Sequence, residues 1–157
     1  MQACCAMSNN FDIVKGLLQE NGEVVSCTSG KSMLPLFRDG RDRAVIVPLL
    51  REPRVNDVLL YRKASTNEVV LHRVIKTRGG TVLRGDNLYF CEQNIPAQDI
   101  LGVMKGFYRN DKYCDCEKST TYKLYCFYIR ASYPLRRLAK KACSFVKKAF
   151  QKKINAA

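Results

Sequence analysis

The sequence contains a serine and a histidine that could act together in nucleophilic chemistry. The chain of 157 residues has a single histidine, His72, which lies in the apolar run 68–76 (EVVLHRVIK). That run is typical of a β-strand, which would hold the imidazole rigidly. A serine hydroxyl is a poor nucleophile unless a base lies within hydrogen-bond reach, and an imidazole with a pKa of about 6.5 can be that base. Ser32, in the run 30–35 (GKSMLP), is a candidate for such a nucleophile.

The same run contains Gly30, Lys31 and Ser32, a triplet that also ends phosphate-binding loops. Such a loop requires a further glycine at position 25, and this chain has Val25 there. The residues that follow are Met-Leu-Pro, where a phosphate-binding loop would begin a helix. We therefore expect neither a nucleotide site nor any cofactor.

The chain also has eight cysteines, which could indicate a disulfide scaffold or a metal site. No secretory signal precedes them, and their spacing is irregular. Cys4 and Cys5 are adjacent and one residue separates Cys114 from Cys116, whereas zinc ligands are usually about two to four residues apart. We expect no metal ligands, and thiols that are reduced as in a cytoplasmic protein.

Short β-rich runs would position the serine and the histidine. An apolar spacing typical of a helix covers residues 11–20 and stops at Asn21-Gly22. After it come β-rich runs separated by turn residues: 23–28, 43–47, 57–62, 68–76, 81–84 and 99–107. The pattern becomes helical again from about Thr120, with a break near Pro134. This order predicts a mainly β (α+β) protein with antiparallel strands, a short N-terminal helix and C-terminal helices.

Several motifs in this region resemble those of a known peptidase superfamily. They are, in order, residues 30–35 (GKSMLP), 39–42 (DGRD), 55–62 (VNDVLLYR), 71–75 (LHRVI), 84–87 (RGDN) and 95–103 (IPAQDILGV). Between about Ser26 and Phe107 they follow the order found in the serine peptidases that include type I signal peptidases and LexA-like self-cleaving repressors. In the family's Gly-Asp-Val strand motif, Asn56 stands at the glycine position. The resemblance implies an antiparallel, coiled β-sheet domain.

The resemblance also implies roles for individual residues. Bacterial signal peptidases and LexA-like proteins have a lysine base, whereas endoplasmic-reticulum and archaeal signal peptidases have His followed by Arg-Val, as this chain has at His72. The resemblance therefore implies a Ser32/His72 enzyme. Lys76, at even spacing from His72 on the same strand, is an alternative base, but it falls four residues past the family position. The acid that orients His72 is Asp86, in the Gly-Asp-Asn motif, or Glu92, a few residues later. We favour Asp86 slightly as a site residue and leave the orienting role open.

The oxyanion and substrate sites are less fully defined. The backbone N–H of Ser32 is the expected first oxyanion donor. Some relatives add a serine hydroxyl two residues before the nucleophile, where this chain has Gly30, so that Ser29 is the nearest hydroxyl. The resemblance implies a shallow apolar groove for small side chains. Its candidate lining residues are Met33, Leu34 and Pro35, with Leu36 as a further apolar neighbour.

The net charge of +13 divides unevenly along the chain. Residues 118–157 hold 11 basic residues and no acidic one, whereas residues 1–117 hold 16 basic and 14 acidic residues, a net charge of +2. From about 133 to 154, apolar and basic side chains alternate as on an amphipathic helix. That helix could contact an anionic membrane surface, pack on the β domain, or bind an acidic partner. The helix could also bind nucleic acid, which is the less expected partner.

These observations predict three segments: an N-terminal helix at 1–22, a peptidase-like β domain at 23–110 and a basic helical tail at 111–157. We expect a cytoplasmic serine endopeptidase, peripheral on a membrane at most, that processes a leader-like or signal-like peptide or a small precursor polypeptide. The segment before Ser32 offers neither the transmembrane anchor of exported-protein peptidases nor a DNA-binding domain of the LexA kind. The alternative is an inactive or non-enzymatic relative that binds a membrane surface or nucleic acid through the cationic helix.

Overall fold

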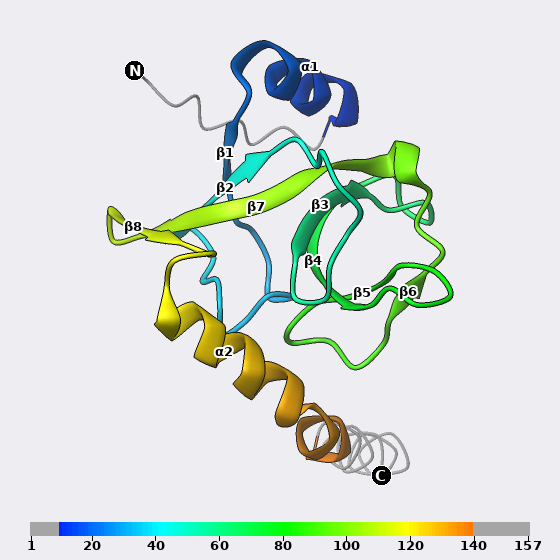
Figure 1. Cartoon of the computed structure of the whole chain (residues 1–157), viewed down its shortest axis with the longest axis vertical. Helices are drawn as coiled ribbons and strands as arrows, with labels where there is room; N and C mark the ends of the chain where they lie inside the picture. The colour runs from blue at the N-terminus through cyan, green and yellow to red at the C-terminus, as the bar shows by residue number, and fades with distance from the viewer. Residues whose placement is uncertain (1–9, 140–157) are drawn as a thin grey trace, which may run out of the picture.

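The computed structural model describes residues 10–139, which form one antiparallel β-sheet with helices at its two ends (Figure 1). The elements are α1 (Phe11–Asn21), β1 (Val24–Cys27), β2 (Asp42–Val47), β3 (Val58–Arg62), β4 (Val69–Lys76), β5 (Val82–Arg84), β6 (Glu92–Gln93), a 3-10 turn (Ala97–Asp99), β7 (Ile100–Arg109), β8 (Lys112–Asp115) and α2 (Thr120–Ala131). Residues 133–139 are also helical. The expectation of a mainly β protein is thus confirmed.

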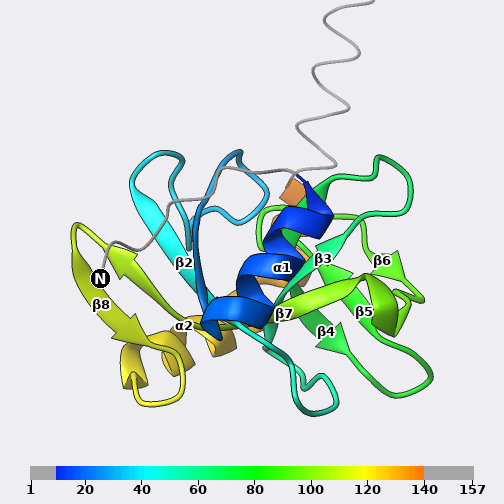
Figure 2. The same cartoon turned by 90° about the horizontal axis from the view of Figure 1, so that it is seen from above.

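The long strand β7 organises the sheet. The strand order is β1-β2-β7-β3-β4-β5-β6, and β8 also pairs with β7. The first part of β7 pairs with β3 and the rest with β2, so that one strand joins both halves of the sheet. Irregularities in register within β2, β3 and β4 accompany the curvature of the sheet, which Figure 2 shows from above.

The expected runs match most of the strands, but β6 and β8 were not predicted. β6 has only two residues, too few for a periodic pattern. β8 has the sequence KYCD, which shows no run of apolar residues. It forms because the turn at Asn110 and Asp111, both at positive φ, folds the chain back onto β7.

The N-terminal helix begins and ends as the sequence predicts. The Asn10 side chain accepts a hydrogen bond from the Asp12 N–H, which caps the first turn. Gly22 ends the helix at φ 70, a left-handed conformation that glycine adopts without strain. α1 packs against β1 and β7 through Val14 and Leu18 (Figures 1 and 2).

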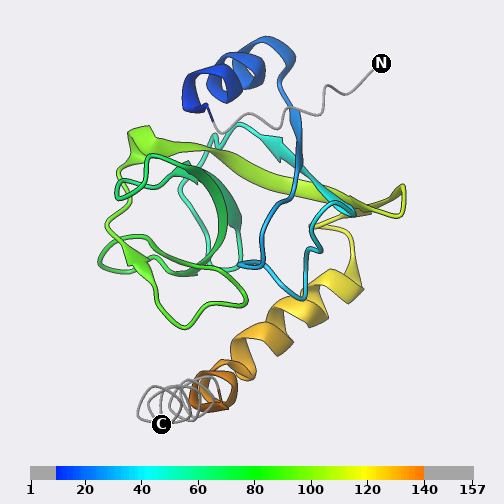
Figure 3. The same cartoon turned by 180° about the vertical axis from the view of Figure 1, so that it is seen from behind.

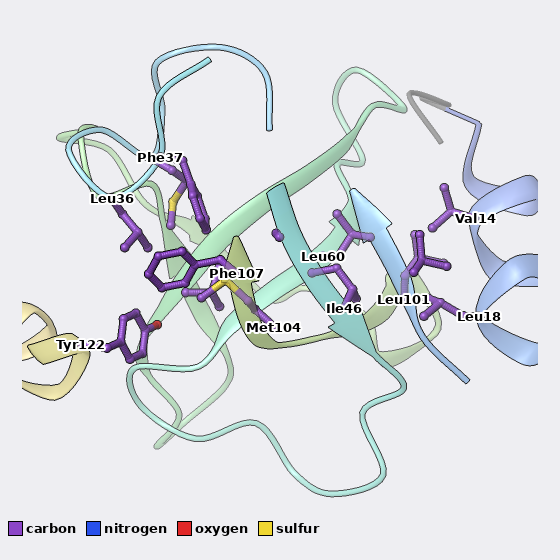
Figure 4. Packing of buried hydrophobic residues seen from close by; sticks show 14 of the residues in the cluster. Val14, Leu18, Leu36, Phe37, Ile46, Leu60, Leu101, Met104, Phe107 and Tyr122 are labelled. Carbon is purple, nitrogen blue, oxygen red and sulfur yellow. The ribbon is translucent and has the colours of Figure 1, made fainter. Parts of the chain in front are cut away.

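Two apolar clusters lie on the two faces of β3. Val58 and Leu60 belong to a large cluster that joins α1, the segment after Ser32, β7 and α2 (Figure 4). Leu59 and Tyr61 belong to a second cluster with Val74 and Leu83. Because successive side chains of a strand point to opposite faces, β3 is buried on both faces, which explains its uninterrupted apolar sequence.

The helix α2 begins at a serine cap and packs with one face only. Ser119 accepts a hydrogen bond from the Tyr122 N–H, and Tyr122 and Cys126 enter the large cluster. Figure 3 shows α2 descending from the β8 end of the sheet, away from α1. The aromatic stretch 122–129 is therefore only partly buried. Phe127 and Tyr128 are exposed because they lie on the opposite face of the helix.

Other expectations concern the cysteines and the tail. Cys27 is disulfide-bonded, so the expectation of reduced thiols is wrong for this residue. Spacing along the chain does not reveal which thiols meet in the fold. The free thiols within residues 10–139 are Cys91, Cys114, Cys116 and Cys126. The same residues contain no helix with the length and apolar character needed to span a membrane.

The predicted helix 133–154 is described only up to residue 139, and its remainder lies outside the described residues. The segment boundaries 1–22, 23–110 and 111–157 stay a prediction.

Candidate active site

Ser32 lies at the start of a turn, on the wall of a cleft. Gly30 precedes it at φ 81, and the side chain of Ser32 is half-buried. The cleft has a volume of about 300 Å³. Its walls include the β1 residues Ser26 and Cys27, the segment 28–33 without Lys31, and residues 68–71 at the beginning of β4. The turn thus presents Ser32 to the cleft between β1 and β4.

The turn that contains Ser32 rests on the Gly85-Asp86-Asn87 segment. The Asn87 N–H donates to the Ser32 carbonyl oxygen at 2.8 Å, and the Asn87 side-chain amide donates to the Lys31 carbonyl oxygen at 2.9 Å. A Cβ at Gly85 would lie 2.7 Å from the Ser32 carbonyl oxygen, so only glycine fits there. Residues 85–87 therefore fix the backbone of the expected nucleophile.

Asp86 forms a buried ion pair with Arg73, and within the described residues it makes no hydrogen bond to His72. Arg73 donates from Nε and Nη2 to the two carboxylate oxygens of Asp86, both at 2.7 Å. Each side chain is 2% exposed. Tyr125 of α2 donates a further hydrogen bond to Asp86 at 2.9 Å. Ion pairing and hydrogen bonding hold the guanidinium of Arg73 at a pKa well above its ordinary value, despite the opposing effect of burial.

The C-terminal helices complete the surroundings of this ion pair. Arg73 also donates to the Tyr122 hydroxyl, at 3.1 Å, and to the carbonyl oxygen of Asn56, at 3.0 Å. Farther along, Arg136 donates to the backbone carbonyl oxygen of Asp86 at 2.8 Å. The start of the predicted helix 133–154 is thus anchored to the segment that supports Ser32.

His72 lies on the other face of β4, where a hydrogen-bond chain holds its ring. The imidazole is 4% exposed, and its Nδ1 lies 2.8 Å from the hydroxyl oxygen of Tyr61. That hydroxyl donates to Glu92 Oε2 at 2.5 Å. A tyrosine has one hydroxyl proton, and Tyr61 uses it in the hydrogen bond to Glu92. The Tyr61 hydroxyl oxygen therefore accepts the hydrogen bond from His72, which assigns the proton of the neutral ring to Nδ1. This tautomer leaves Nε2 unprotonated, which is the form that a general base requires.

Burial and the neighbouring charges favour a neutral His72 and a protonated Tyr61 hydroxyl. Burial, against the opposing effect of Glu92, lowers the pKa of His72 below its ordinary value and favours the neutral imidazole. Burial and the neighbouring Glu92 raise the pKa of Tyr61 well above its ordinary value, so its hydroxyl keeps its proton. Glu92 Oε1 accepts no hydrogen bond within residues 10–139. It lies 3.4 Å from Lys63 Nζ and 3.7 Å from His72 Nδ1.

His72 is not among the residues that line the cleft beside Ser32, and no hydrogen bond joins the two side chains within the described chain. Val70 shares its face of β4 with His72 and lines the same cleft as Ser32. Arg73, next to His72, binds the segment that supports Ser32. Hydrogen bonds between catalytic groups are often loose before substrate binds and tighten in the complex.

The remaining candidates lie in different surroundings. Ser29 and Gly30 are exposed and line the cleft with Ser32. Met33 lines the cleft and enters the core, whereas Leu34 is half-buried and outside the cleft lining. Pro35 is exposed and borders a separate cleft near α2. The structure thus brings only Met33 of the three groove candidates to the Ser32 cleft.

The two other residues considered from the sequence are Lys76, the alternative base, and Leu36, the apolar neighbour of the groove candidates. Lys76 is exposed and follows a register shift in β4. Leu36 is buried in the large core cluster. The structure therefore leaves His72 as the candidate base with buried polar partners.

Sequence reasoning missed Tyr61 and Arg73 as parts of this site. Tyr61 is fully buried at the end of an apolar strand, where a buried hydroxyl needs a partner. Arg73 interrupts an apolar strand, and buried arginine is almost always paired with an acid. Both signals were available, but the identity of each partner depends on the register of the sheet.

The described residues contain no group of three or more His, Cys, Asp or Glu side chains placed to hold a metal ion. No protein-family model matches the chain, and no curated protein matches it in sequence.

Replacing Asp86 with Asn should destabilise the fold, because it leaves the Arg73 guanidinium buried without its counter-charge. Removing one partner of a buried ion pair typically costs about 3–5 kcal/mol. We expect Asp86→Asn to lower the free energy of unfolding by about that amount in a urea titration. The matched control is Asp111→Asn, because Asp111 pairs with Arg43 on the exposed surface and should change stability little. Equal stability of the two variants would show that the buried pair does not hold the site together.

Proposed function

We propose that the protein is a serine endopeptidase in which Ser32 is the nucleophile and His72 the general base. The observation that carries the proposal is the hydrogen-bond chain from His72 Nδ1 through Tyr61 to Glu92, which leaves Nε2 as the free basic atom. In this proposal Glu92 is the orienting acid, with Tyr61 as a positioning residue between the two. Asp86 supports Ser32 through residues 85–87 and Arg73.

The proposed reaction is acyl transfer to serine. Nε2 of His72 removes the Ser32 hydroxyl proton as Oγ forms a bond to the scissile carbonyl carbon. The N–H of Ser32 stabilises the oxyanion, and His72 then returns the proton to the amine as the C–N bond breaks. In the second half of the reaction, His72 takes a proton from water as the water oxygen attacks the ester carbonyl carbon. The bond between that carbon and Oγ then breaks, and His72 returns the proton to Ser32 Oγ. Ser29, on the rim of the cleft, is a candidate for a second oxyanion donor.

The backbone conformation at two of the motifs supports the resemblance to signal peptidases and LexA-like proteins. Asn56, at the family's glycine position, has φ 81, which asparagine tolerates better than most residues. Gly85 of the Gly-Asp-Asn motif packs against the Ser32 backbone. These features explain why the motifs carry the residue types they do, and we propose a signal-peptidase/LexA-like fold on that basis.

The cleft supports a polypeptide as substrate. Val24 and the apolar side chains of Leu60, Val69 and Leu71 contribute to its walls, next to the polar segment 28–30. A volume of about 300 Å³ suits a short apolar side chain together with some backbone. We therefore propose a substrate with small apolar residues beside the scissile bond, such as a leader-like or signal-like peptide or a small precursor.

Two substitutions test the activity directly. Ser32→Ala and His72→Ala should each reduce kcat/KM on a panel of leader-like peptides by roughly 1000-fold or more, because the two groups act as a unit. A fluorophosphonate probe, followed by peptide mapping, should label Ser32 in the wild type and fail to label either variant. The matched control Ser65→Ala changes an exposed serine in the 64–66 turn and should keep both properties.

Cleavage that survives both substitutions would contradict the site assignment. Absence of both cleavage and labelling in the wild type would favour the non-enzymatic alternative.

Tyr61→Phe tests the positioning role of the hydroxyl. This variant keeps the ring but removes the link between His72 and Glu92, so we expect kcat/KM to fall roughly 10- to 100-fold, within the contribution of a positioned general base. KM should change little, and thermal unfolding should show an intact fold. Tyr128→Phe, on the exposed face of α2, is the control and should leave the rate unchanged. A wild-type rate in Tyr61→Phe would show that the hydroxyl does not orient the base.

A further inference from the structure

The helix α2 has two apolar faces, and only one of them is covered. Tyr122, Cys126 and Ile129 are buried against the body of the protein. Leu124, Phe127 and Tyr128, spaced three and four residues apart, lie on the opposite face and are between 56% and 73% exposed. Three large apolar side chains on the outer face of one helix are more than scattered surface residues.

Exposed apolar side chains continue beyond α2. Leu135 and Leu138, within the helical residues 133–139, are 72% and 64% exposed. The ribbon of α2 and of the helical residues that follow it lies on the side of the molecule away from α1 (Figures 1 and 3).

The charge of this part of the chain indicates what covers the apolar face. Lys123 and Arg130 are exposed on α2 itself, and Arg137 is exposed farther along. All three belong to the segment 118–157, which has 11 basic residues and no acidic one. The charged side chains on this helical part of the described chain are thus all basic. An exposed apolar face with basic side chains on the same helix is complementary to a surface that is negative outside and apolar beneath.

We propose that the outer face of α2, formed by Leu124, Phe127 and Tyr128, is a docking surface for an anionic lipid bilayer. The helix would lie in the plane of the interface, with these side chains among the upper acyl chains and the basic side chains at the headgroups. This differs from the contact expected from the sequence, which began at residue 133. The proposal does not depend on the proposed peptidase activity.

The chain lacks tryptophan, which allows a direct measurement of insertion. Phe127→Trp would place one indole on the proposed surface, and Ile13→Trp would place one on the exposed outer side of α1. With vesicles of equal parts phosphatidylglycerol and phosphatidylcholine, we expect a blue shift of the emission for Phe127→Trp and none for Ile13→Trp. High salt or vesicles of phosphatidylcholine alone should remove the shift, because screening or loss of the lipid charge removes the attraction.

Co-sedimentation with the same vesicles tests the contribution of the apolar face. We expect the triple variant Leu124→Ser, Phe127→Ser, Tyr128→Ser to bind at least tenfold more weakly than the wild type, whereas Ile13→Ser binds like the wild type. All these side chains are exposed, so circular dichroism and thermal unfolding should show that each variant folds.

Three results would overturn the proposal. The first is binding by the triple variant that equals wild-type binding. The second is absence of a blue shift for Phe127→Trp on anionic vesicles. The third is a wild-type dimer in analytical ultracentrifugation that the triple variant abolishes, because a second copy of the chain would then cover this face.

Discussion

The buried ion pair between Arg73 and Asp86 is the interaction on which the arrangement of the site depends. Arg73 belongs to β4, and Asp86 to the segment after β5 that supports the backbone of Ser32. Tyr122 and Tyr125 of α2 form hydrogen bonds with the same pair, so α2 packs against it. Two charges are stable in such surroundings only when each is fully compensated. The pair therefore ties together the strand that carries His72, the turn that carries Ser32, and α2.

Because side chains alternate along β4, the neighbouring residues His72 and Arg73 face opposite sides of the strand and make different interactions. Arg73 faces the ion pair, whereas His72 faces Tyr61 and Glu92 on the other side of the strand. The first interaction fixes the backbone, and the second fixes the ring and its tautomer. Burial disfavours the charged imidazolium and so lowers the pKa of His72. In the proposed mechanism, this neutral and oriented imidazole would accept a proton at Nε2.

Local sequence patterns predicted the larger elements but could not choose between the acids. The runs 57–62 and 68–76 are apolar enough to be recognised as strands, and Asn10 and Gly22 mark the ends of α1. The sequence favoured Asp86 slightly as a site residue and left its role open against Glu92. The two are distinguished by the register in which β4, β5 and β6 pair, because Glu92 lies opposite Leu83, and Leu83 opposite Val74 on the face of β4 that carries His72. That pairing depends on contacts between distant segments, and so does the identification of Tyr61.

The most direct test of this account is the protonation state of His72, observed by ¹⁵N NMR of the imidazole in tag-free protein. The chain has one histidine, so its signals need no further assignment. We predict that the neutral ring carries its proton on Nδ1 and that the pKa lies below 6.5, so the ring stays neutral as the pH falls to that value. A neutral ring protonated on Nε2 would contradict the hydrogen-bond chain through Tyr61 to Glu92 and the role proposed for Nε2, and a pKa above 6.5 would show that burial does not dominate the protonation of His72.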